Sequence, residues 1–134
     1  MYGVESFVHP DAQGGGVGSL LMAARFEAAK RLNVRGLVAG SLIVGYAAVA
    51  HEVSVEGYVL DVMAGKRFDS NLSKQLRKGF VVRNIIPDYT TDLRSCNYGV
   101  AMVWMNPEYK PRSAWKHAHD YNSARRDQAR AGAV

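Results

Sequence analysis

The sequence predicts one α/β domain with a mixed sheet and flanking helices. An apolar run at 2–8 and a helical pattern at 17–32 are separated by a glycine-rich segment, and a short strand pattern follows at 35–39. This order predicts a β-α-β unit with two parallel strands and a right-handed crossover. Two more apolar runs, at 80–86 and 99–105, flank a polar loop, so we expect them to be antiparallel neighbours.

Composition limits the class of protein. The chain has 134 residues and is 48% hydrophobic, which is enough for a packed core. No apolar run approaches the roughly 20 residues of a membrane-spanning helix, and residues 1–15 lack the parts of a signal peptide. The single cysteine, Cys96, excludes an internal disulfide and is expected to pack rather than react. We expect a cytoplasmic protein with no membrane association and no metal site.

The net charge of +5 and the pI near 9.5 raise the question of a nucleic-acid partner. Much of the positive charge lies after Pro107, and no basic stripe is interleaved with aromatic residues. A coenzyme that carries several phosphates would be attracted by the same positive charge, so it explains the charge equally well. Nucleic acid is therefore the least favoured partner.

The helical pattern at 17–32 predicts a buried stripe on one side and charged residues toward water, and Asn33 should end the helix. The stripe comprises Val17, Leu21, Ala24, Ala28 and Leu32. The residues expected to face water are Arg25, Glu27, Lys30 and Arg31.

Two shorter helices are expected between the second and third strands. Ser54 is a suitable N-cap for a helix that ends at Gly65 and buries Tyr58, among other apolar residues. Asp69 or Ser70 should cap a second helix, which carries Leu72 and Leu76 and closes at Gly79.

The glycines between the first strand and the first helix predict an anion-binding loop. They are Gly14, Gly15, Gly16 and Gly18. Glycine lets the backbone turn sharply and approach a ligand closely, and the helix that follows offers free N–H groups and the positive end of its dipole. Such a cradle usually binds phosphate. It is neither a Walker A loop, because Ser19-Leu20 follows the last glycine, nor a dinucleotide fingerprint, because the glycine spacing differs.

The pattern Gln13-x-x-Gly16-x-Gly18 behind Val8-x-Pro10 resembles the acetyl-CoA pyrophosphate loop of the GNAT superfamily of N-acyltransferases. Matches over residues 36–109 resemble one subgroup, which is often joined to or found beside a carbon–nitrogen hydrolase domain. They include Val38-Ala39-Gly40-Ser41, Gly45-Tyr46, Glu56-Gly57-Tyr58-Val59, Leu72 to Phe80, Pro87-Asp88-Tyr89 and Trp104-Met105-Asn106-Pro107. The resemblance predicts a partial GNAT domain at 1–111 and a separate basic tail, helical or disordered, at 112–134.

The resemblance implies the position of the coenzyme. Backbone groups of Ser6, Phe7 and Val8 would lie along the pantetheine arm, and Gln13 would order the loop. The residues that would hold the pyrophosphate are Gly14, Gly15, Gly16, Val17, Gly18 and Ser19. The implied reaction is attack of an amine, of a small molecule or a peptide, on acetyl-CoA or another acyl-CoA. It needs a base for the amine proton and an acid for the departing thiolate.

Two departures from the family pattern affect this expectation. Many GNAT enzymes have a tyrosine, the thiolate's acid, where this chain has Gln75, and an amide cannot give up a proton near neutral pH. By residue type the weak candidates for the acid are Tyr46, Tyr58, His51 and Tyr89. The second departure is that the strands and helices that precede 2–8 in a complete GNAT domain are missing. We therefore expect a fragment of a longer protein; the alternatives are that a second copy fills the missing edge or that the sequence begins at an internal Met. The isolated chain is expected to dimerise or aggregate through the exposed strand at 2–8.

Three functions remain open from the sequence. The leading hypothesis is an acyl-CoA-dependent N-acyltransferase or its cofactor-binding half. The second is a non-catalytic module that binds CoA or docks onto a hydrolase, and Gln75 favours it. The third is nucleic-acid binding through the tail, which predicts a steep salt dependence that is lost when 112–134 is deleted.

Overall fold

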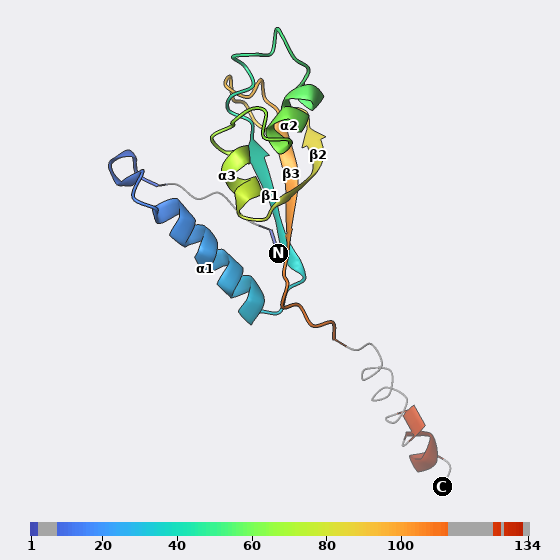
Figure 1. The fold of residues 1–134 in the computed structure, drawn as a ribbon. Coiled ribbons are helices and arrows are strands. Elements are labelled where there is room, and N and C mark those ends of the chain that lie inside the picture. The colour runs from blue at the N-terminus through green and yellow to red at the C-terminus, as the bar shows by residue number, and fades with distance from the viewer. Residues whose placement is uncertain (3–7, 113–124, 127, 133–134) are drawn as a thin grey trace.

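The computed structural model describes residues 1–2, 8–112, 125–126 and 128–132. Within these residues three strands form a sheet in the order β1-β3-β2 (Figure 1). They are β1 (Gly36–Leu42), β2 (Val81–Ile86) and β3 (Gly99–Met105). Both neighbouring pairs are antiparallel, which confirms the predicted pairing of the last two strands. Strand β1 is longer than predicted, because its pairing with β3 continues to Leu42 opposite Gly99.

The start of the chain lies parallel to β1. The amide of Val38 donates to the carbonyl of Met1 at 2.8 Å, and the terminal amino group of Met1 donates to the carbonyl of Gly36 at 3.1 Å. Tyr2 and Val38 form a parallel bridge. This is the parallel arrangement that the β-α-β pattern predicts, and with it the sheet is mixed. Residues 3–7 of the expected strand at 2–8 lie outside the described residues.

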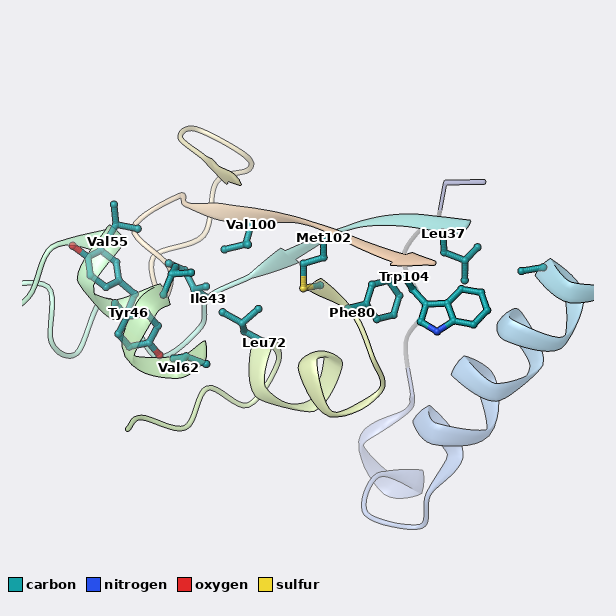
Figure 2. Packing of buried hydrophobic residues seen from close by; sticks show 13 residues of the cluster. Leu37, Ile43, Tyr46, Val55, Val62, Leu72, Phe80, Val100, Met102 and Trp104 are labelled. Carbon is teal, nitrogen blue, oxygen red and sulfur yellow. The ribbon is translucent and has the colours of Figure 1, made fainter. Parts of the chain in front are cut away.

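The core covers one face of the sheet. Leu37 on β1 and Val100, Met102 and Trp104 on β3 are buried there, since alternate residues of a strand share a face. Figure 2 shows these side chains on the same side as Leu72. On the opposite face Val38 and Met105 remain 42% and 50% exposed. The sheet is therefore packed on one side and largely open on the other.

The helix α1 (Val17–Arg31) ends where expected, with Asn33 in a left-handed conformation, but its buried face differs from the prediction. Phe26 stacks on Trp104 with ring centroids 4.3 Å apart. Met22, Phe26 and Ala29, spaced by four and three residues, form the inward face. Of the predicted stripe, Val17, Leu21, Ala24 and Leu32 are exposed, and of the residues predicted to face water, Arg25 and Lys30 are half-buried. The predicted stripe was wrong because the helix carries two overlapping apolar stripes, and the aromatic contact selects the other one.

The helix α2 (Val55–Met63) begins at the predicted cap, Ser54, whereas α3 (Leu72–Arg77) follows Asn71 as its N-cap, which was neither of the two predicted candidates. The hydroxyl of Ser54 accepts from the amide of Gly57 at 3.1 Å, and Gly65, at φ +76°, follows the end of α2. Asn71 makes no side-chain cap, and of the two predicted candidates it is Asp69 whose side chain bonds to the start of the helix. Its carboxylate accepts from the amides of Asn71 and Leu72, each at 2.9 Å. No helix within the described residues is long and apolar enough to span a bilayer.

Candidate coenzyme site

The glycine-rich loop joins a single 3₁₀ turn, Pro10–Ala12, to the start of α1. The side-chain amide of Gln13 donates to the carbonyl of Val8 at 3.0 Å, so it ties the two ends of the turn together. On the exposed side the ring Nδ1 of His9 accepts from the amide of Asp11 at 3.3 Å. Val8 and Gln13 lie next to the loop, whereas Ser6 and Phe7 lie outside the described residues.

Two glycines give the loop its shape. Gly14 and Gly16 have φ of +82° and +83°, in the left-handed region where a side chain is strained. Gly16 is the N-cap of α1 and supplies no side-chain cap, so the first amides of the helix have no partner within it. A Cβ added at Gly14 or Gly16 would meet nothing within 4 Å, and residues 11–20 are all exposed. The loop is an open cradle of N–H donors at the positive end of a 15-residue helix.

Two of the four candidate acids lie in the core. Tyr46 is 7% exposed and its hydroxyl donates to the carbonyl of Val53 at 3.1 Å. Tyr58 is 3% exposed and its hydroxyl donates to the carboxylate of Asp69 at 2.8 Å. Burial raises the pKa of both phenols, and the hydrogen bond to Asp69 raises the pKa of Tyr58 further. This placement favours a structural role for both residues, because each proton is committed to a protein acceptor.

The other two candidates lie nearer the surface. His51 is exposed, with its Nε2 3.2 Å from a carboxylate oxygen of Glu52. Tyr89 is half-buried on the open face of the sheet, where a Cβ added at Gly40 or Gly99 would overlap its ring. Of the four residues, Tyr46 and Tyr58 are in contact, with ring centroids 5.4 Å apart.

Gln75 on α3 has a feature that its residue type did not predict. Its side-chain oxygen Oε1 is buried and has no hydrogen-bond partner, and among the described residues no other buried side-chain polar atom is in this state. Such an unpaired acceptor costs about 1–3 kcal/mol. The only sequence signal was an amide on a short apolar helix, which does not distinguish an unpaired oxygen from a paired one.

Sequence reasoning placed Asp69 at the start of α3 but missed its bonds to α2 and to the turn after β1. Its Oδ1 caps the helix, and its Oδ2 accepts from Tyr58 and, at 3.0 Å, from the amide of Gly45. The amide of Asp69 donates to the hydroxyl of Ser73 at 2.8 Å, which makes the cap reciprocal. One carboxylate therefore fixes α3 relative to α2 and to the turn after β1.

A cavity of about 570 Å³ lies between α2 and α3, away from the glycine-rich loop. It is lined by Val62, Met63, Gly65, Lys66, Arg67, Phe68, Ser73, Leu76 and Arg77. None of the predicted site residues lines it. In the part of the chain that the structure describes, no three His, Cys, Asp or Glu side chains come together as metal ligands would.

The residues of the loop fit a coenzyme that carries a diphosphate. An uncapped helix N-terminus, two left-handed glycines and open space above them suit an anion. The glycine-rich loop, α1 and a mixed sheet are the elements that the resemblance to the GNAT superfamily predicts.

Comparisons with known proteins agree with this class. None of the known protein-family models matches the chain. Over 113 residues it is 37% identical to the uncharacterized N-acetyltransferase YkwB of Bacillus subtilis, covering 84% of this chain and 50% of that protein. Over 125 residues it is 35% identical to the probable hydrolase YhcX of the same organism, covering 92% of this chain and 24% of that protein.

A solved structure shows the same fold. GphF, a GNAT-like decarboxylase in complex with isobutyryl-CoA, matches with a TM-score of 0.60 at 24% identity, over 73% of this chain and 51% of that one. The chain therefore has a GNAT-like fold. It spans half of one curated relative and about a quarter of the other.

Proposed function

We propose that the chain binds acyl-CoA through residues 13–19 as the coenzyme-binding part of an N-acyltransferase. The observation that carries this proposal is the open, uncapped N-terminus of α1 behind two left-handed glycines. The relation to an N-acetyltransferase and the fold shared with a protein in complex with isobutyryl-CoA support it. Acetyl-CoA as the particular donor, and a small-molecule or peptide amine as the acceptor, are part of the proposal.

The chain's own groups have distinct tasks in this function. The amides of residues 14–19 bind the diphosphate, and Gln13 holds the loop in shape through Val8. The bound coenzyme supplies an activated acyl thioester. The hydroxyls of Tyr46 and Tyr58 donate to the carbonyl of Val53 and the carboxylate of Asp69. Because these two protons are already bonded, the proton for the thiolate comes from water, His51 or Tyr89.

The non-catalytic alternative is favoured by one specific observation. The position that carries an acid in related enzymes holds Gln75, whose amide cannot act as an acid near neutral pH. In this alternative the chain binds CoA or docks onto a hydrolase without transferring an acyl group. A transfer assay with acetyl-CoA and a broad panel of amines separates the two. Acetylated product supports the enzyme, and tight CoA binding without product supports the module.

The test of the shared claim is calorimetry with CoA on the chain and on Gly16→Val. A side chain at φ +83° strains the cradle and covers its amides. Losing one or two hydrogen bonds to a charged group predicts an affinity at least about tenfold weaker. Gly15→Ala is the matched control, because its Cβ would lie 3.9 Å from the carbonyl of Ala12, an ordinary contact. Equal affinity for all three proteins would contradict the proposed site.

Pairing of the edge at 2–8 with a second copy, and association with a carbon–nitrogen hydrolase domain, remain proposals. Sedimentation of the isolated chain tests the first of them. A concentration-dependent dimer supports edge pairing, and a strictly monomeric, cooperatively unfolding protein contradicts it.

A further inference from the structure

The unpaired oxygen of Gln75 lies on a part of α3 that is tied to α1. The backbone carbonyl of Gln75 accepts from the amide of Phe80 at 3.2 Å. The ring of Phe80 lies 5.9 Å from that of Phe26 on α1, and Phe26 also stacks on Trp104. Figure 2 shows Phe80 and Trp104 next to each other on the helix-covered face of the sheet. The end of α3 therefore packs, through these aromatic residues, against the helix that begins at the glycine cradle.

The chemistry of the side chain limits what can satisfy it. An amide oxygen only accepts, so its missing partner is an N–H or O–H donor. Buried acceptors are paired in nearly all proteins, and an exception is explained by a water, an ion or a ligand that completes it. The side chains of Phe80 and Leu72, which are buried and lie close to Gln75 in the sequence, carry no hydrogen-bond donor.

We propose that the side-chain oxygen of Gln75 accepts a hydrogen bond from an amide N–H of the arm that joins the diphosphate of acyl-CoA to its thioester. The inference rests on the proposed function, because the diphosphate in the glycine cradle anchors the arm beside α1. The arm carries two amide N–H groups, and each must be paired once the arm leaves water. Gln75 is a positioning residue in this reading, and it takes no part in proton transfer.

The experiment compares two probes on two variants. CoA carries the diphosphate and the amide arm, whereas ADP carries the diphosphate and lacks the arm. Gln75→Met keeps the size of the side chain and removes the acceptor, and Lys74→Met, at an exposed position of the same helix, is the matched control. Affinities are measured by calorimetry, and the unfolding temperature of each ligand-free protein is measured alongside.

The expected result is specific to the arm. Gln75→Met should bind CoA about three- to tenfold more weakly, bind ADP as tightly as the unchanged chain, and unfold at the same or a higher temperature. Lys74→Met should bind both probes as the unchanged chain does. An unchanged CoA affinity, or an equal loss for CoA and ADP, would overturn the role of Gln75 alone. An unchanged chain that binds neither probe would overturn the proposed function and this inference with it.

Discussion

The buried carboxylate of Asp69 joins α2, α3 and the turn after β1 through hydrogen bonds. It is 1% exposed and accepts from two amides at the start of α3, from the amide of Gly45 and from the hydroxyl of Tyr58. A buried charge is tolerated when such donors surround it. Gln75 differs in this respect, since its buried oxygen has no donor. We infer that Asp69 serves the fold and Gln75 serves a ligand.

Replacing Tyr58 by Phe tests the role of Asp69 in the fold, because it changes how the unfolding free energy depends on pH. The pKa of Tyr58 is raised by burial and then by the hydrogen bond to Asp69, so the folded chain holds this proton to higher pH than the unfolded chain does. Its contribution to stability is complete below the ordinary tyrosine pKa of about 10 and is lost as the pH rises beyond that value.

In denaturant titrations Tyr58→Phe should lose about 1–3 kcal/mol of unfolding free energy at pH 7. It should also show a shallower decline above pH 10 than the unchanged chain. Some decline remains, because burial raises the pKa of Tyr46 as well. Equal slopes for the two proteins above pH 10 would contradict the assignment.

At the scale of the elements, α1 touches the core through few residues. Phe26 stacks on Trp104, and the side chain of Asn106 donates to the carbonyl of Ala29 at 3.4 Å. Lys30 pairs with Glu27 at 2.9 Å and with Glu108 at 3.3 Å. The N-terminal half of the helix, with Leu20 at 70% exposure, extends away from the sheet (Figure 1).

Because α1 is buried through Phe26 and not through Leu20, truncating these two side chains should lower the unfolding free energy by unequal amounts. Phe26→Ala should lower the unfolding free energy by about 3 kcal/mol, because it removes a ring stacked in the core. Leu20→Ala should change it by less than about 0.5 kcal/mol, as expected for an exposed position. Chemical denaturation measures both values. A loss for Leu20→Ala as large as that for Phe26→Ala would contradict this assignment of the buried face.

On the open face of the sheet, Tyr89 packs directly on glycine. A Cβ at Gly99 would lie 2.5 Å from its ring carbons, so Gly99→Ala should lower the unfolding temperature clearly. Tyr89→Ala alone should cost less, and the double variant should recover most of the loss caused by Gly99→Ala. Additive losses in this cycle would show that the two positions do not interact.

At the scale of the whole molecule, the sequence predicted the order of elements, the antiparallel pair, the cap of α2 and the presence of Asp69 at the start of α3. Local signals sufficed there, because Ser54, Asp69 and Gly65 act within one turn of their own helix. The buried face of α1 could not be predicted, because it depends on the stacking of Phe26 on Trp104, about 80 positions further along the chain.

For the site, the glycine-rich loop was predictable because its geometry is local, and the unpaired state of Gln75 was not, because it depends on every atom around that oxygen. The hydrogen-bond partners and the burial of the four candidate acids could not be predicted from the sequence either. The hydroxyl of Tyr58 meets Asp69, which lies 11 positions away, and Tyr89 crosses two strands of the sheet.

The basic tail gives a prediction for the molecule as a whole. Deleting 112–134 should leave CoA affinity unchanged within about twofold, because the cradle is at the other end of the chain. Fluorescence anisotropy with labelled duplex DNA, in low and moderate salt, checks the remaining hypothesis for the tail. Tight binding that weakens steeply with salt and vanishes on deletion would favour nucleic acid as the partner.

The most direct test of the central claim follows the backbone amide resonances of the ¹⁵N-labelled chain as CoA is added. The account predicts that the amides of Gly14, Gly16, Val17 and Gly18 shift first and farthest, and that ADP shifts the same four. If CoA binds while these amides stay in place, or if saturating CoA moves no resonance, the glycine-rich loop is not the coenzyme site.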